Sequence, residues 1–461
     1  MSINKNMNFI VLLFLFFGWG FVTCLNDLLT PILKGIFELN QFQANFVSLA
    51  FFTAYFVGSL FYIVCSALGF KFFLKLGYNG LIILGLALAG TGCLIFIPAA
   101  LYKSYSLFLM GLFSIGFGFT FLQISANPLV LISGDPKTGA SRLNIAGGFN
   151  SLATTIAPLI GVIVFYNWLD VKNNHEHLKY PYIFLSLFFV LIAILIWRLL
   201  QTRETHTFNL DSGKPYALNH ANLVFGMLAI FFYVGAEVAV GTNLVAYLKA
   251  SDTVNLAENV AAKFLAFYWG GAMIGRFLGG VALSEIRRLR KLVTMCAIAV
   301  VLTTLLIYTV NLSDQPFYDK LMNLKYYIGF EILAIVLFMF IGNPRINLVL
   351  FSIVNIINLI IGSNIHDSWF AAWAILSIGL FNSIMWPNIF DLAIDGLGKY
   401  KEQASSFLIM MILGGAILPV IQGYIADHTN IVISFLVPLV GYVYILGYSV
   451  FYTQKKLNLI K

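Results

Sequence analysis

Two carboxylates lie inside long apolar segments of this sequence. Asp27 stands in the run that begins at Phe9, and Glu237 stands about three residues past the centre of a later run. An ionisable side chain inside a membrane is costly and by default indicates a function. Low dielectric disfavours the charged form of a carboxylate, so an acid whose surroundings change can bind and release a proton. Both acids are therefore candidate functional residues.

Amides and indoles occur in the same kind of segment. Gln123 and Asn127 are four residues apart and share one helical face. Amides donate and accept hydrogen bonds, as a sugar hydroxyl requires, and indole faces can stack on a pyranose ring. An alternative role is interhelical hydrogen bonding, worth about 0.6 kcal/mol for each amide. The candidate substrate-binding residues are Asn26, Gln123, Asn127, Asn150, Glu237, Trp269, Asn382 and Trp386.

The composition requires that these residues be positioned by membrane helices. Sixty per cent of the 461 residues are hydrophobic and 10% are charged, whereas soluble domains carry roughly 25% charged residues. A span needs about 20 apolar residues. We predict fourteen spans and a polar linker over 202–219. The spans cover roughly 8–33, 41–68, 77–101, 105–132, 140–169, 180–201, 220–248, 258–283, 291–312, 325–342, 346–363, 367–394, 403–426 and 431–453.

The basic residues predict the orientation in the membrane. With both termini in the cytoplasm, all eight arginines fall on the inner side, as the positive-inside rule requires. The net charge of +8 is scattered over these loops and does not indicate nucleic-acid binding. We expect a multi-pass protein of the cell (inner) membrane.

An internal repeat divides the chain into related halves. Pro128, Ala140 and Pro158 have counterparts 259, 264 and 261 residues later, at Pro387, Ala404 and Pro419. Parallel repeats about an axis along the membrane normal are a transporter architecture, with the substrate site between the halves. The consecutive GxxxG steps at 271–279 predict close approach of a neighbouring helix. We interpret Arg276 as an interfacial or gating charge.

Motifs for enzymes and metal sites are missing from the sequence. Walker A, HExxH and GxSxG patterns do not occur, so ATP-driven pumping and hydrolysis are not supported. The four cysteines form no CxxC pair and are expected to be packing residues. We expect no cofactor and no metal, and the sequence does not indicate an oligomeric state.

Several segments together resemble the fucose:proton symporter family of the major facilitator superfamily. They include Leu25-Asn26-Asp27, Gln123 to Pro128, Tyr233 to Glu237, Gly275-Arg276-Phe277 and Met385 to Phe390. The resemblance implies proton coupling at Asp27. Glu237 is the second candidate for this role because it lies near the centre of its apolar run. The fucose branch has Glu at the position of Gln123 and Gln at that of Glu237. This chain has the two residue types exchanged, and it has Gly147 where the fucose branch has another Gln. In these features it resembles the glucose/galactose branch.

The resemblance implies an all-helical major facilitator fold with two six-helix bundles, over 1–201 and 220–461. Because that family has twelve spans, we expect an added transmembrane hairpin at 325–363. The expected function is import of a hexose, glucose or galactose, by symport with a cation, H⁺ before Na⁺. Fucose or N-acetylglucosamine import, and export of drugs or metabolites, stay as alternatives.

Overall fold

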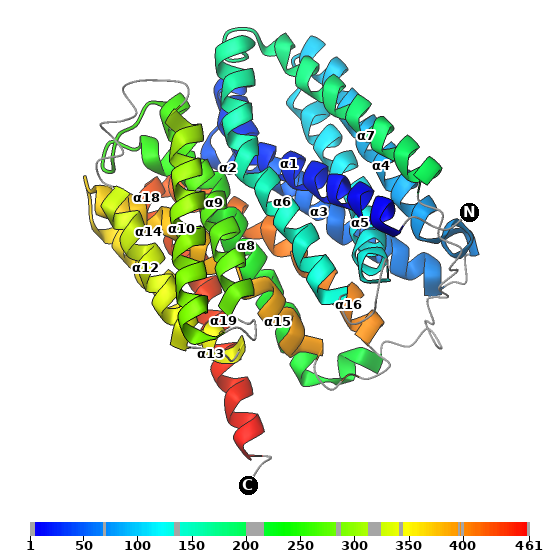
Figure 1. The fold of residues 1–461 in the computed structure, drawn as a ribbon. Coiled ribbons are helices and arrows are strands. Elements are labelled where there is room, and N and C mark those ends of the chain that lie inside the picture. Colours follow the sequence, from blue (N-terminus) through cyan, green and yellow to red (C-terminus); the bar gives the residue numbers. More distant parts are fainter. Residues whose placement is uncertain are drawn as a thin grey trace.

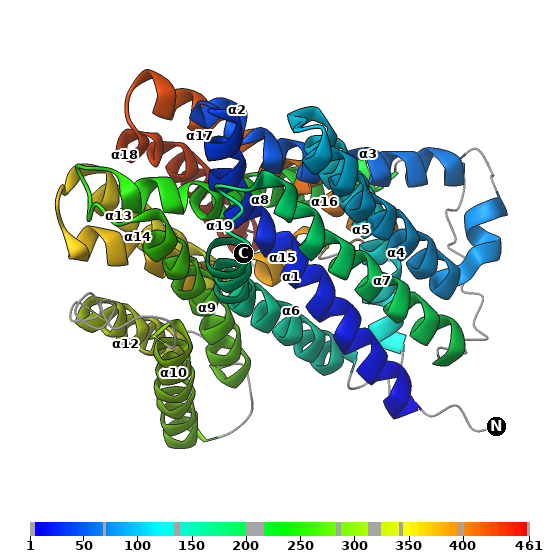
Figure 2. The same ribbon diagram turned by 90° about the horizontal axis from the view of Figure 1, so that it is seen from above.

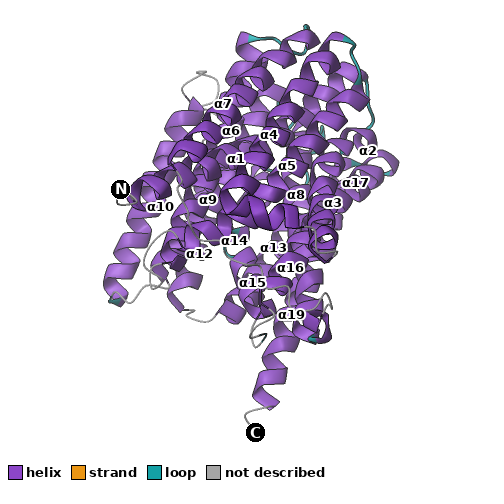
Figure 3. Ribbon diagram, turned by 90° about the vertical axis from the view of Figure 1, so that its right-hand side faces the viewer, coloured by secondary structure: helices purple, strands orange, loops and turns teal. Residues whose placement is uncertain are grey.

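The computed structural model describes residues 5–67, 71–132, 139–199, 216–282, 287–311, 324–340, 344–394, 397 and 401–458. The regular elements in these ranges are all helices (Figure 1 and Figure 3). A chain in lipid must satisfy its backbone hydrogen bonds internally, which a helix does. The predicted all-helical class is confirmed. Most of the predicted linker, 202–215, lies outside the described residues.

The first half contains six long helices and several short segments. Its elements are α1 (Lys5–Phe37), α2 (Gln41–Ala44), α3 (Phe46–Ala67), α4 (Lys71–Leu101), α5 (Tyr105–Ile132), α6 (Gly139–Gly161), a π-helical segment (Val162–Trp168), a 3-10 segment (His175–Leu178) and α7 (Lys179–Leu199).

The second half begins with a 3-10 segment (Tyr216–Asn219). Its helices are α8 (Ala221–Lys249), α9 (Glu258–Ala282), α10 (Arg288–Asn311), α12 (Leu324–Phe340), α13 (Pro344–Asn364), α14 (Trp369–Asn382), α15 (Met385–Ile394), α16 (Lys401–Met410), α17 (Gly414–His428), α18 (Ile431–Ser434) and α19 (Leu436–Asn458), with a 3-10 turn (Met411–Leu413) between α16 and α17.

The predicted number of fourteen spans is not confirmed, although each predicted span has a helical counterpart. Among the described residues, eleven helices are long and apolar enough to cross a membrane, or up to twelve if the bent pair α14 and α15 is one span. The helices that miss this standard are α9, which carries Glu258, Lys263 and Arg276, and α12, which has only 17 residues.

Corresponding helices of the two halves pack in the same pairs. α1 packs against α6, as α8 packs against α17, and α3 packs against α5, as α9 packs against α14. In the first half α4 contacts α5 and α7, and in the second half α13 contacts α14 and α19. Figure 1 shows most first-half helices, blue to cyan, on one side and most second-half helices on the other. This pattern is what a repeated half predicts.

α10 and α12 lie at the edge of the second half. α10 packs against α9, and α12 packs against α14 and α10. Figure 2 shows this pair to one side of the other helices. Much of α10 is exposed, including Val293, Val300 and Val301. An apolar exposed face of this kind suits contact with lipid.

The glycine stripe of α9 brings that helix into close contact with α14. A Cβ on Gly275 would lie 2.3 Å from Ser383 Oγ, and a Cβ on Gly379 of α14 would lie 1.9 Å from the Tyr268 carbonyl oxygen. No larger residue fits at either position without displacing the neighbouring helix. The prediction that this stripe permits close helix approach is confirmed.

The helix that carries Trp386 is broken. α14 ends at Asn382, α15 begins at Met385, and the two helices are bent by 44°. Pro387 lacks the N–H that would bond the Ser383 carbonyl, and its ring crowds that carbonyl. Proline therefore explains the break locally, and Trp386 lies just beyond the break on α15.

Candidate functional site

Asp27 of α1 bonds two side chains from the second half of the chain. Trp269 Nε1 of α9 donates to Asp27 Oδ2 at 2.9 Å, and Thr242 Oγ1 of α8 donates to Asp27 Oδ1 at 3.2 Å. Asp27 is only 4% exposed. Burying a carboxylate is tolerable only when donors replace the lost water. Asp27 thus lies where the two halves meet, with its charge supported from the opposite half.

Thr242 extends this link to a third helix. Ser48 Oγ of α3 lies 3.0 Å from Thr242 Oγ1. The neighbouring Gly241 allows close packing, since a Cβ there would lie 3.3 Å from Asp27 Oδ2. Neither Ser48 nor Thr242 was predicted, because a hydroxyl residue in an apolar helix can bond its own backbone and gives no distinct signal.

Glu237 of α8 is surrounded by tyrosines. Tyr233 OH donates to Glu237 Oε1 at 2.9 Å, and Tyr268 OH of α9 donates to the Glu237 carbonyl oxygen at 2.9 Å. Arg276 and Asp27 are close enough to interact with Glu237 electrostatically. Glu237 is half-buried. The two predicted acids therefore belong to one site.

Gln123 of α5 lies inside the first half. It is 7% exposed and is hydrogen-bonded to the hydroxyl of Tyr55 on α3. Trp19 Nε1 of α1 donates to the same hydroxyl at 3.2 Å. Asn127, one turn beyond Gln123, is half-buried. Tyr55 and Trp19 were not predicted, because aromatic residues are common in apolar helices.

Two other predicted amides of the first half are Asn150 on α6 and Asn26 on α1. Asn150 Nδ2 of α6 donates to the Phe16 carbonyl oxygen of α1 at 3.0 Å. This bond ties α6 to α1, the alternative role considered for such amides. The side chain of Asn26 lies outside the described residues.

Asn382 is fully buried among second-half side chains. Its Oδ1 accepts from Tyr442 OH at 2.8 Å and from Asn355 Nδ2 at 3.0 Å, and its Nδ2 donates to Tyr268 OH at 3.2 Å. These partners leave its amide little capacity for a ligand. Trp386 is half-buried, and its ring centroid lies 6.5 Å from that of Tyr233. Trp386 therefore packs near Tyr233, whose hydroxyl bonds Glu237.

Arg276 connects α9 to α6, on the opposite half. Its Nη1 donates to Ser151 Oγ and, at 3.5 Å, to the Gly147 carbonyl oxygen. The interpretation of Arg276 as an interfacial or gating charge stays a prediction. A Cβ on Gly147 would meet no atom within 4 Å. Open space therefore lies beside Arg276.

A second set of contacts between the halves is formed by buried amides, here named the amide cluster: Gln41, Asn45, Asn243 and Gln422. Gln41 Nε2 donates to Asn243 Oδ1 at 2.9 Å, and Asn243 Nδ2 donates to Gln422 Oε1 at 3.1 Å. Asn45 Nδ2 also donates to Asn243 Oδ1, at 3.1 Å. None of these four residues is among the predicted substrate-binding residues.

Asp427 reinforces the same contact at the start of α2. Its carboxylate accepts from the backbone N–H groups of Gln41 at 2.9 Å and Phe42 at 2.7 Å. A carboxylate at a helix N-terminus bonds N–H groups that have no partner within the helix. The end of α17 is thus attached to the first half by charged as well as neutral hydrogen bonds.

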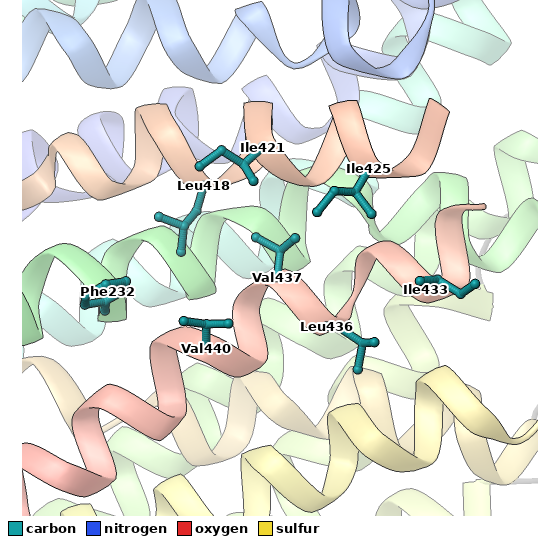
Figure 4. Close-up of a pocket in the computed structure, with 8 residues that line it drawn as sticks. All are labelled: Phe232, Leu418, Ile421, Ile425, Ile433, Leu436, Val437 and Val440. Atoms are coloured by element: carbon teal, nitrogen blue, oxygen red, sulfur yellow. The ribbon is translucent and has the colours of Figure 1, made fainter. Parts of the chain in front are cut away.

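An apolar groove on the second half is unsuited to a sugar. It has a volume of about 390 Å³ and is lined by Phe232, Leu418, Ile421, Ile425, Ile433, Leu436, Val437 and Val440 (Figure 4). No lining side chain offers a hydrogen bond. Within the described ranges, no group of three or more His, Cys, Asp or Glu side chains could hold a metal ion.

Known proteins resemble this chain over nearly its whole length. No protein-family model matches it. The glucose/galactose transporter of Brucella abortus biovar 1 (strain 9-941) is 37% identical, covering 97% of this chain and 95% of its own. The putative glucose/galactose transporter of Helicobacter pylori (strain ATCC 700392 / 26695) is 33% identical, over 94% of each chain. The L-fucose-proton symporter of Escherichia coli (strain K12) is 27% identical, over 98% of this chain and 94% of its own.

A solved structure agrees with these relatives. FucP, a major facilitator superfamily transporter in the outward conformation, matches with a TM-score of 0.64 and 25% identity, over 96% of this chain and 98% of that one. The chain belongs to the fucose:proton symporter family of the major facilitator superfamily. A bacterial homologue of the lysosomal transporter Spinster, in an inward-facing conformation, shares the fold, with a TM-score of 0.64 and 12% identity.

Membership of the fucose:proton symporter family confirms the main functional prediction at its coarser level. The chain is a multi-pass sugar transporter of the major facilitator superfamily, and its relatives are transporters, not enzymes. The predicted family resemblance is confirmed as well.

Proposed function

We propose that this protein imports a hexose, glucose or galactose, by symport with H⁺. The proposal is supported by relatives named glucose/galactose transporter and L-fucose-proton symporter. The observation that carries it is the Asp27 carboxylate, buried between the halves and bonded to Trp269 and Thr242 of the opposite half. A titratable group at that place can link proton binding to relative movement of the halves.

Protonation of Asp27 would loosen the contact between α1 and the pair α8 and α9. Hydrogen bonds to an ionised acceptor are roughly twice as strong as neutral ones. When Asp27 takes up a proton, the bonds from Trp269 and Thr242 become neutral and weaken. Proton binding on one side of the membrane and release on the other would thereby be coupled to opening and closing of the site.

The sugar would lie between Gln123, Glu237 and Trp386. Glu237 offers a partly accessible acceptor, Gln123 offers an amide, and Trp386 offers an aromatic face. The open space at Gly147 would give room for part of the ring substituents. Asn26, Asn127, Asn150 and Trp269 remain proposed ligands. We propose a supporting role for Asn382 instead, because its amide already bonds three side chains.

We infer that the bundles cover 1–201 and 220–461, with a linker over 202–219 and both termini in the cytoplasm. The packing favours a revised position for the added pair of helices. α13 contacts α14 and α19 as α4 contacts α5 and α7, so α13 fits the two-bundle core. The added pair is then α10 with α12, in place of the hairpin predicted at 325–363, which joins α12 to α13. Both alternatives add two helices, so the helices that follow keep the same orientation in the membrane.

Uptake by proteoliposomes tests this function. Labelled glucose and galactose should accumulate under an inward H⁺ gradient, and unlabelled fucose and N-acetylglucosamine should compete weakly. Accumulation driven by an Na⁺ gradient alone would show that Na⁺, and not H⁺, is the coupling ion. If no sugar of the panel enters under either gradient, the import proposal fails, and efflux assays with drugs or metabolites follow.

A further inference from the structure

The hydroxyl of Tyr233 has a single proton and two acceptors. It lies 2.9 Å from Glu237 Oε1, one turn away on α8, and 3.2 Å from the carbonyl oxygen of Asn382 on α14. Tyr233 is 1% exposed, so bulk water does not compete at this position. A hydroxyl has one O–H to donate, so a stronger bond to one acceptor weakens the bond to the other.

The second acceptor, the Asn382 carbonyl oxygen, lies next to the bend between α14 and α15. Asn382 is the last residue of α14, directly before the 44° bend to α15. The last carbonyls of a helix have no partner within that helix. The Asn382 carbonyl is therefore bonded by α8 through Tyr233, and α15 beyond the bend carries Trp386. Tyr233 thus touches both the acid of the site and the bend.

The rest of Asn382 is held firmly. Its side chain is bonded by Tyr442 of α19, Asn355 of α13 and Tyr268 of α9. Such a fixed frame keeps the Asn382 carbonyl within reach of the phenol. The frame leaves the direction of the Tyr233 O–H as the variable part of the arrangement.

We propose that Tyr233 is a positioning residue that transmits the state of Glu237 to the bend between α14 and α15. The inference rests on the proposed sugar and proton site. A charged Glu237 attracts the phenol proton strongly. A Glu237 that is neutralised, or occupied by a ligand hydroxyl, releases the phenol to Asn382, which fastens the bend to α8. The other ionisable groups that interact with Glu237 are Arg276, Asp27, Tyr268 and Tyr442.

Hydrogen–deuterium exchange of the α15 amides tests the relay in the full-length protein in detergent or nanodiscs. Glu237→Gln places a neutral amide at the acid and should slow α15 exchange about fivefold, the population change expected from one neutral hydrogen bond. In the background Tyr233→Phe, the same Glu237→Gln change should have no effect on α15. Tyr442→Phe is the matched control, because it removes a hydroxyl that bonds the Asn382 side chain and keeps the Tyr233 hydroxyl with its two acceptors, so it should preserve the response.

Saturating galactose should slow α15 exchange more in the wild type than in Tyr233→Phe, in which only direct contact of the sugar with Trp386 would remain. The relay is overturned if Glu237→Gln does not alter α15, or if the response survives Tyr233→Phe. Equal loss of the response to Glu237→Gln in the Tyr233→Phe and Tyr442→Phe backgrounds would also overturn the relay, because that result means general loosening around Asn382. Failure of galactose and glucose to bind would refute the proposed cargo, while the sugar-free variants would still decide the relay.

Discussion

Replacement of Asp27 by Asn is the most direct test of coupling at the contact between the halves. The carboxamide has the shape of a protonated Asp but cannot release a proton. In the native chain Trp269 Nε1 lies 2.9 Å from Asp27 Oδ2, and the amide oxygen of the variant can accept the same bond. The NH₂ group of the variant can donate to the Thr242 hydroxyl. Both bonds remain possible in neutral form, so the variant should fold.

The size of the effect follows from the loss of charge. A hydrogen bond to a charged group contributes about 1.5–3 kcal/mol and a neutral one about 0.5–1.5 kcal/mol. Loss of charge assistance at Trp269 therefore removes about 1–2 kcal/mol, or a factor of about 5–30 in the balance between joined and separated halves. This balance would no longer depend on proton binding at Asp27.

Two transport assays distinguish these consequences. Accumulation of labelled galactose under an inward H⁺ gradient should be lost in Asp27→Asn, whereas exchange of labelled for unlabelled galactose at equal pH should remain measurable. Thr242→Val is the control, since it removes one donor and keeps the acid, and it should still accumulate sugar. Full accumulation by Asp27→Asn would refute the proposed role of Asp27 and leave Glu237 as the coupling acid.

Three further predictions concern the sugar and the added helices. Gln123→Ala should weaken hexose binding by about 1–3 kcal/mol, the usual cost of leaving a buried partner unpaired, in a titration by intrinsic fluorescence; an unchanged affinity for every hexose would assign Gln123 to helix packing. Gly147→Leu should raise the half-saturation for uptake because its side chain enters open space, whereas Gly329→Leu on α12, which also meets no atom within 4 Å, should not; equal behaviour of both variants would contradict a ligand space at Gly147. Deletion of 288–340 should preserve uptake better than deletion of 325–363, because α13 contacts α14 and α19; the opposite order would restore the hairpin first predicted.

The sequence could predict the class of fold because lipid imposes it. Segments such as 105–132 are apolar on all sides, and a chain in lipid has few alternatives to a helix. The acids Asp27 and Glu237 could also be found, because charge inside a span is rare and costly. Their appearance in one site agrees with that reasoning.

The partners of these acids could not be predicted from one sequence. Thr242, Ser48 and Tyr55 are ordinary residues in membrane helices, and only three-dimensional packing brings them to polar groups. The position that we propose for the added helices likewise depends on packing. Hydropathy marks α10, α12 and α13 as similar apolar segments, whereas contacts with α14 and α19 distinguish α13 from the other two.

The amide cluster has a consequence for the speed of the transport cycle. Gln41, Asn45, Asn243 and Gln422 carry no charge, and each can bond water as readily as another amide. Because a typical neutral hydrogen bond contributes only about 1 kcal/mol net, separating these side chains exchanges bonds of nearly equal free energy. These neutral bonds therefore add little to the barrier against opening, and most of the resistance at this contact comes from the charged bonds of Asp427 to the start of α2. The direction of net transport is then left to the ion gradient.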